Sequence, residues 1–159
     1  LDVLRHVAAR LPQGQEPHPN GPLLAPATAL PLQRGLNTQQ RQRLQGHHGP
    51  QARDVVAAAK DGELQTISGT HTLWVELRWA ARHESIVHLQ DLMLRRTRLG
   101  LLLRGGGVGC MPRIRSICQA ELGWDDARWD AEQAAYRALW QQHYSPTPWA
   151  SRPPETSHV

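Results

Sequence analysis

Prolines gather near both ends of this 159-residue chain and limit the part that can form a folded core. Six of the 12 prolines lie from Pro12 to Pro31, and four more lie in the last 15 residues. Proline fixes the backbone angle φ and has no amide hydrogen to donate, so such segments are extended and supply little core. We therefore expect a Pro-rich linker up to residue 35, a folded domain over residues 36–144 and a disordered tail over residues 145–159.

The segment before the linker has the pattern of a short helix. Apolar residues recur over residues 1–11 at the spacing of one helix face, and Pro12 ends the pattern. We interpret this segment as the end of a connecting helix. Because the chain begins at Leu1 and not at Met, we also expect it to be a piece of a longer protein.

Composition excludes several classes of protein. A hydrophobic content of 40% fits one ordinary domain, and no apolar run approaches the roughly 20 residues that a membrane-spanning helix needs. The formal charge of +4 allows weak attraction to nucleic acid or anionic lipid, but it is modest beside dedicated binders. Two cysteines are too few for a disulfide framework, so we expect a reducing, cytoplasmic setting.

Helical patterns fill the middle of the chain. Asn37 with Gln40 three residues later predicts a capping box and a helix up to residue 45, and an Ala-rich segment over residues 51–60 predicts a second helix. Residues 73–84 carry apolar side chains on two sides, so we expect a helix that is buried on more than one face and central in a bundle. The two stripes are Leu73, Leu77, Ala80 and Ala81 on one side, and Val75 and Trp79 on the other.

Later segments complete the predicted bundle, and no strand pair or internal repeat is visible. A break over residues 85–88 precedes a helix over 89–98 that Gly100 caps, and the run Gly105 to Gly109 predicts a flexible connection. Two more helices follow, one from Pro112 to Leu122 ended by Gly123, and one N-capped by Asp125 that runs to His143. The predicted fold class is all-α, a small bundle of five or six helices.

Motifs that would bind a cofactor or metal are weak. The glycines near Gly105 lack the G-x-G-x-x-G spacing of a dinucleotide fingerprint and follow no strand. His47, His48 and the later histidines form no H-x-x-x-H pair, so no metal site is predicted. Cys110 precedes a predicted helix, but no histidine partner can be assigned, and we interpret it as a packing residue. We predict no catalytic, cofactor-binding or metal-binding residue.

A run of arginines leaves two interpretations open. Between Asp91 and Glu121 the chain has six arginines and no acidic residue, which a nucleic-acid-binding module could use. The alternative is internal pairing, because Asp91 lies four residues before Arg95 and the last predicted helix is acidic. We favour pairing over nucleic-acid binding. The candidates for structural ion pairs are Glu84, Asp91, Arg95 and Arg96.

Three stretches of the chain point to a known family. They are "LNTQQRQRLQGHHG", "VELRWAARHESIVHLQDLMLRRTRLGLL" and "ELGWDDARWDAEQAAY". Together they resemble the C-terminal helical domain of bacterial FAD-dependent glycerol-3-phosphate dehydrogenases, and "LDVLRHVAARLP" with "ALPLQRG" resembles that family's connecting helix and linker. The resemblance covers about residues 1–144.

The resemblance implies a parent enzyme that oxidises sn-glycerol 3-phosphate to dihydroxyacetone phosphate, reduces FAD and passes electrons to quinone. It implies that this chain lacks the flavin site and the active site, and that its partner is the FAD-binding core of the same parent chain. A homo-oligomer contact and a peripheral contact with the inner face of the bacterial cell membrane are left open. The alternative function is a stand-alone basic helical module that binds nucleic acid or a protein partner.

Overall fold

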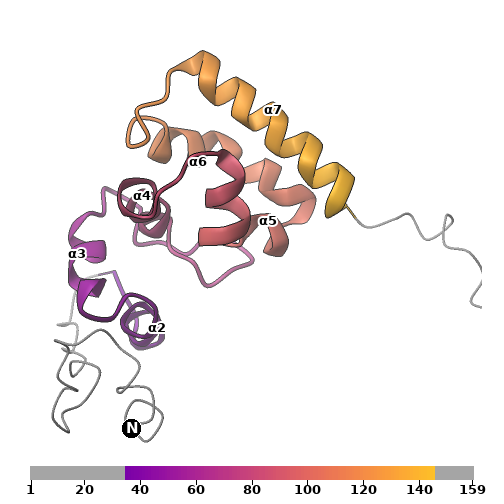
Figure 1. Ribbon diagram of the computed structural model, residues 1–159. Helices are drawn as coiled ribbons and strands as arrows, with labels where there is room; N and C mark the ends of the chain where they lie inside the picture. Colours follow the sequence, from indigo (N-terminus) through magenta and orange to yellow (C-terminus); the bar gives the residue numbers. More distant parts are fainter. Residues whose placement is uncertain (1–34, 146–159) are drawn as a thin grey trace, which may run out of the picture.

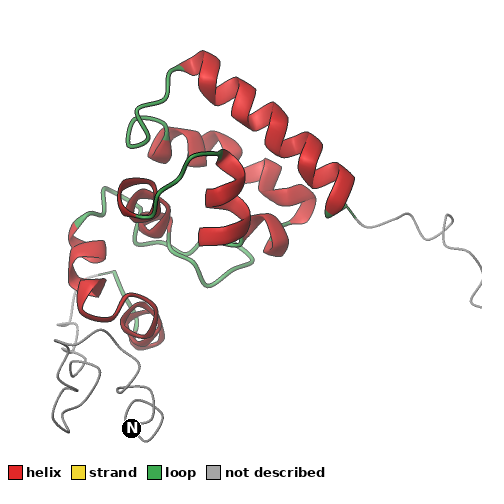
Figure 2. Ribbon diagram, in the orientation of Figure 1, coloured by secondary structure: helices red, strands yellow, loops and turns green. Residues whose placement is uncertain are grey.

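A computed structural model of the chain describes residues 35–145. Within them it has six α-helices and no strand, which confirms the all-α class (Figure 1). Figure 2 shows the helices joined by loops, and one antiparallel bridge between Thr66 and Leu73 closes the loop before the central helix. The predicted helix over residues 1–11, the Pro-rich linker and the C-terminal tail lie outside the described residues.

The helices follow one another along the chain with short connections. In order they are α2 (Thr38–His48), the 3₁₀ turn η1 (Gly49–Gln51), α3 (Ala52–Ala57), α4 (Trp74–His83), the π-helical η2 (Asp91–Arg96), α5 (Leu99–Leu102), the 3₁₀ segment η3 (Arg104–Cys110), α6 (Met111–Cys118) and α7 (Asp126–His143). In Figure 1, α4 lies between α2 and α3 on one side and α5, α6 and α7 on the other.

The central helix α4 packs on two separate apolar clusters, as its two predicted stripes require. Leu77 and Ala80 belong to the larger cluster with α6 and α7, whereas Val75 and Trp79 belong to the smaller cluster with α2 and α3. Leu73 lies in the smaller cluster and not with Leu77 as predicted. The reason is that Leu73 is the extended N-cap residue of α4, with ψ 152°, so its side chain does not follow the helical spacing.

Two helices, α2 and α7, begin where the capping residues predicted. The side chain of Asn37 accepts from the Gln40 amide at 2.8 Å, and the Gln40 side chain accepts from the Asn37 amide at 2.9 Å, so the predicted capping box is confirmed. Asp125 accepts from the Arg128 amide at 2.8 Å and starts α7, which ends at His143 as predicted.

The two helix ends that were predicted from a following glycine are wrong. Gly100 does not cap a helix, because η2 ends at Arg96, Arg98 takes the left-handed φ of 57°, and α5 then carries Gly100 inside it. A Cβ at Gly100 would overlap the Tyr136 hydroxyl, so the glycine permits a close helix contact. Helix α6 ends at Cys118 and not at residue 122, and irregular turns lead from there to α7.

The prediction of a flexible connection at Gly105 to Gly109 is also wrong, because the glycines form a packed turn. Gly105, Gly106 and Gly107 have φ values of 61°, 69° and 80°, in the left-handed region that favours glycine. Helix α7 closes over this turn, since the Tyr136 hydroxyl donates to the Gly106 carbonyl at 2.6 Å. A Cβ at Gly106 would lie 2.8 Å from the Trp140 ring.

We expect Gly106→Ala to lower the free energy of unfolding by about 2 kcal/mol or more, since it combines a left-handed alanine with a clash against Trp140. Gly109→Ala is the matched control, because Gly109 has no positive φ and no atom lies within 4 Å of its added Cβ. Urea unfolding of both variants measures the difference. Equal stabilities of the two variants would show that the turn is not packed as described.

Candidate functional site

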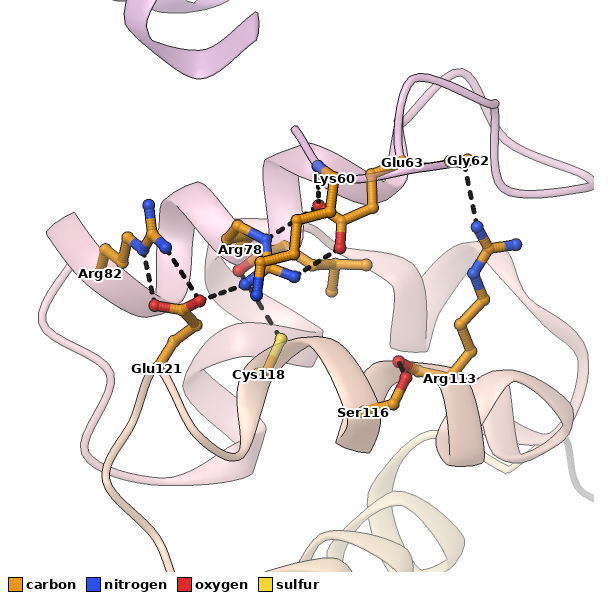
Figure 3. A network of polar contacts seen from close by, with 10 residues as sticks. Lys60, Gly62, Glu63, Arg78, Arg82, Arg113, Ser116, Cys118 and Glu121 are labelled. Carbon is orange, nitrogen blue, oxygen red and sulfur yellow. Dashed lines mark hydrogen bonds and ion pairs between the residues drawn. The ribbon is translucent and has the colours of Figure 1, made fainter. Parts of the chain in front are cut away.

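A buried arginine on α4 joins three parts of the domain. Arg78 is only 3% exposed, and it donates to Glu63 at 2.8 Å through Nε. Its guanidinium also pairs with Glu121, which lies beyond the end of α6. Figure 3 shows Arg78 between these two carboxylates, with Arg82 donating to Glu121 at 2.6 and 3.0 Å. The pairs tie the loop before α4 and the segment after α6 to the central helix.

Charge pairing keeps these groups ionised although they are buried. Burial by itself raises the pKa of Glu63, but hydrogen bonds from Arg78 and the Lys60 amide outweigh it, and the pKa falls below its usual value. Hydrogen bonds from Arg82 lower the pKa of Glu121 in the same way. Because a buried charge without its partner is costly, removal of either partner alone should destabilise the fold.

A second buried carboxylate on α4, Glu76, holds α2 in place. Arg43 donates to both of its oxygens, at 2.7 and 2.9 Å, and the Leu73 amide donates to it at 2.6 Å. Burial would raise the pKa of Glu76, but the hydrogen bonds from His48, Arg43 and Leu73 lower it to about 2. Glu76 is therefore an ionised carboxylate inside the domain, 4% exposed.

The histidines beside Glu76 give the geometry of a three-ligand group. His47 Nδ1 lies 3.6 Å and His48 Nε2 3.5 Å from the same Glu76 oxygen. Ligand atoms of all three residues lie within 4.8 Å of one another. However, Arg43 already engages both carboxylate oxygens, so a metal cation would have to lie beside a guanidinium. We therefore interpret the group as an ion-paired carboxylate and not as a metal centre.

Asp91, a predicted ion-pair candidate, is the first residue of η2 and binds the backbone that leads into it. It accepts from the His88 amide at 2.8 Å and from the Val87 amide at 3.2 Å, and it pairs with Arg95 as the spacing predicts. Burial would raise the pKa of Asp91, but these donors lower it below its usual value. Glu132 of α7 accepts from the Leu89 amide at 3.0 Å, so a second carboxylate binds the backbone before η2.

The other two candidates, Glu84 and Arg96, form no ion pair with a residue in the range 35–145. Arg96 is exposed, and water can solvate its guanidinium without a partner. The acidic groups of α7 are engaged elsewhere: Asp126 and Asp130 accept from Arg115 at 2.7 and 2.8 Å. The acidic side chains of α7 therefore neutralise Arg115, but they form no pair with Arg96.

A hollow of about 550 Å³ brings Glu84, Arg95 and Arg96 together with residues that the sequence did not connect to them. Its lining is rich in basic side chains and comes from α2, from the loop before α4, from α4 and its C-terminal end, and from the segment that runs from η2 into α5. The lining residues are Arg43, His47, His48, His71, Thr72, Glu76, Ala80, Glu84, Arg95, Arg96, Thr97, Arg98 and Leu102.

Sequence reasoning missed the buried pairs Glu76–Arg43 and Arg78–Glu63. One signal for them exists, because α4 is apolar on two sides and yet carries these charges, which have to be paired when buried. Their partners could not be found from spacing, since Arg43 lies 33 residues from Glu76 and Glu63 lies 15 residues from Arg78.

Two further features bear on the class of protein. Cys110 is partly buried against the larger apolar cluster, in keeping with a packing residue. No helix within residues 35–145 is long and apolar enough to cross a membrane. Residues 35–145 thus form a small all-α domain in which the buried charged groups are committed to ion pairs.

Comparison with known proteins identifies the family. A family profile described as the C-terminal domain of alpha-glycerophosphate oxidase matches residues 7–129, so the chain belongs to this family. Glycerol-3-phosphate dehydrogenase 2 of Mycobacterium bovis and of Mycobacterium tuberculosis is 33% identical over 107 residues, or 65% of this chain and 18% of the relative. Glycerol-3-phosphate dehydrogenase of Mycobacterium leprae is 30% identical over 109 residues, with the same shares. No solved structure matches significantly.

This chain therefore spans only about a fifth of the length of these relatives, 18% in each case. The matched residues include α2 to α6 and the first turn of α7. Both buried networks on α4 lie inside the matched part of the chain.

Arg78→Met should lower the free energy of unfolding by about 3–5 kcal/mol, because it leaves Glu63 buried without its partner. Arg115→Met is the control, since Arg115 pairs with carboxylates that are 84% and 66% exposed and its loss should change stability little. Urea unfolding at neutral pH measures both. A loss for Arg78→Met as small as that for Arg115→Met would contradict a structural role for the buried network.

The pKa of Glu76 predicts a dependence of stability on pH. Because its folded-state pKa is about 2 and its ordinary value is 4.5, the unfolded state takes up a proton first as pH falls. Stability from Glu76, about 3 kcal/mol, is thus present above about pH 4.5 and lost as pH falls towards about 2.

Glu76→Gln should remove that part of the pH dependence while the other paired carboxylates keep theirs. Unfolding free energies of both proteins, measured from about pH 5 to about pH 2, should converge as pH falls. Parallel curves for the two proteins would show that Glu76 is not held ionised by Arg43.

Proposed function

We propose that this chain is the helical C-terminal accessory domain of an FAD-dependent glycerol-3-phosphate dehydrogenase. The observation that carries the proposal is the family match over residues 7–129, together with relatives named glycerol-3-phosphate dehydrogenase. The parent would oxidise sn-glycerol 3-phosphate to dihydroxyacetone phosphate, with FAD as the first electron acceptor and quinone as the next. Domain boundaries at residues 36 and 144 are part of this proposal.

The described residues do not fit a flavin site. Dinucleotide binding uses a strand, a tight glycine turn and a helix N-terminus that faces the pyrophosphate. Residues 35–145 contain no strand, and the glycine turn at Gly105 to Gly107 is closed by Tyr136 and Trp140 of α7. In this proposal FAD and the substrate bind to the core of the parent, and no catalytic step is assigned to this chain.

The partner in this proposal is that FAD-binding core, in the same parent chain. A cytoplasmic location, at the inner face of the bacterial cell membrane, follows from the use of quinone by the proposed parent. The alternative of a nucleic-acid-binding module receives no support from the arginines of the ion-pair networks. Arg78, Arg82 and Arg115 are engaged by carboxylates of this chain.

A segment exchange tests the proposal. The matching C-terminal segment of the Mycobacterium tuberculosis relative is replaced by this chain, and FAD content and glycerol-3-phosphate-dependent dye reduction are measured. We expect the chimera to retain flavin and turnover, whereas the relative without its C-terminal segment loses them. A chimera with Arg78→Met is the matched control and should lose stability. A folded chimera without flavin would contradict the proposed role.

The isolated chain provides the complementary measurement. Saturated with FAD and passed through gel filtration, it should retain no flavin and should reduce no dye with glycerol 3-phosphate, since no side chain can accept a hydride reversibly. Flavin retained at a near-equimolar ratio, or turnover above the blank, would show that the chain is itself an enzyme.

A further inference from the structure

One anionic group of the protein, the carboxylate of Glu76, lines the basic hollow beside α4. The carboxylate of Glu76 accepts two hydrogen bonds from Arg43 and lies within 3.6 Å of ring nitrogens of His47 and His48. This wall of the hollow is therefore electrically balanced by an internal carboxylate. Arginine and histidine side chains are therefore the groups that surround this carboxylate.

The other arginines of the lining are only partly offset by carboxylates. Arg95 is offset by Asp91, but Arg96 and Arg98 form no ion pair with any residue in the range 35–145. Glu84 is the acid on the lining that no guanidinium engages within that range. Two arginines against one carboxylate leave a net positive charge there, before any protonation of the histidines is counted.

The backbone at Arg98 has an uncommon conformation. Arg98 has a φ of 57°, in the left-handed region that costs a long side chain about 1–2 kcal/mol. Ser85, which follows the lining residue Glu84 in the sequence, also has a positive φ, of 51°. Left-handed residues other than glycine cluster at binding sites, where the surrounding structure maintains their strain. Of these two residues, Arg98 lines the hollow itself.

We propose that this hollow binds a small phosphate-bearing anion, inorganic phosphate or a soluble phosphomonoester, through its lining residues Arg96, Arg98 and His71. The inference does not depend on the proposed function of the chain. Guanidinium groups match the oxygens of phosphate with two hydrogen bonds each, and a phosphate dianion can be neutralised by two arginines. The volume of about 550 Å³ is within the range of small-molecule sites.

A small soluble ligand fits this site better than a surface-bound polyanion. The site is a concavity with basic groups contributed by several elements, and it is not a stripe along one helix face. Its chemistry would also suit the phosphate of a lipid headgroup. The experiment therefore compares free phosphate with vesicles.

The test uses the 159-residue chain in chloride buffer at constant ionic strength. Inorganic phosphate is titrated in and followed by calorimetry and by amide NMR shifts. We expect saturable binding with the largest shifts at residues 95–98 and at His71. Shifts centred elsewhere, or no saturation, would overturn the proposal without any variant.

Substitutions then test whether Arg96 and Arg98 bind the phosphate. Arg96→Gln and Arg98→Asn each remove one guanidinium, and asparagine tolerates the left-handed conformation of residue 98. Each should weaken phosphate binding by about tenfold or more. Arg137→Gln is the matched control, because Arg137 is an exposed arginine on α7 and lies outside the lining. Equal losses in the control would mean unspecific charge attraction and would overturn the site.

The last measurement is binding to lipid vesicles. Co-sedimentation is measured with neutral phosphatidylcholine vesicles and with vesicles that contain phosphatidic acid. Binding to the acidic vesicles without saturable binding of free phosphate would show a lipid surface site and overturn the proposal of a soluble ligand. Competition of free phosphate with any vesicle binding would support it.

Discussion

The structure depends on a helix that is buried on two sides and still carries charge. Helix α4 packs on both apolar clusters, so Glu76 and Arg78 cannot reach water to solvate their charges. Each of them requires a partner from elsewhere in the chain. Arg43 of α2 and Glu63 of the preceding loop provide these partners, and the pairing fixes both elements against α4.

A different kind of contact fixes the other half of the domain. Helix α7 approaches α5 and η3 so closely that Gly100 and Gly106 leave no room for a side chain. Tyr136 and Trp140 then donate to the carbonyls of these glycines, at 2.6 and 2.7 Å, and burial raises the pKa of Tyr136 to about 12. At these two glycines, hydrogen bonds to the backbone carbonyls hold α7 in place where no side chain could fit.

The ion pairs of the domain leave positive charge without an acidic partner around the segment after η2. The pairs on α4 and on α7 use most carboxylates of the described residues, so the segment after η2 has fewer acids available to it. Arg96 and Arg98 are exposed and take part in none of these pairs within residues 35–145. The hollow shares Arg43 and Glu76 with the structural pairs, whereas Arg96 and Arg98 line the hollow alone.

Local information in the sequence determined the all-α class, the capping box at Asn37, the start of α7 at Asp125 and the two-sided burial of α4. These features depend on residues a few positions apart, where helical spacing and capping chemistry act directly. Only the tertiary structure decided that Gly100 lies inside a helix, that Gly106 packs under Trp140 and that Glu76 pairs with Arg43. Those contacts join residues 30 or more positions apart, so no local pattern encodes them. The same reason explains why Arg96 has no acidic partner among the described residues, since the carboxylates of α7 face Arg115 and His88 once the helices pack.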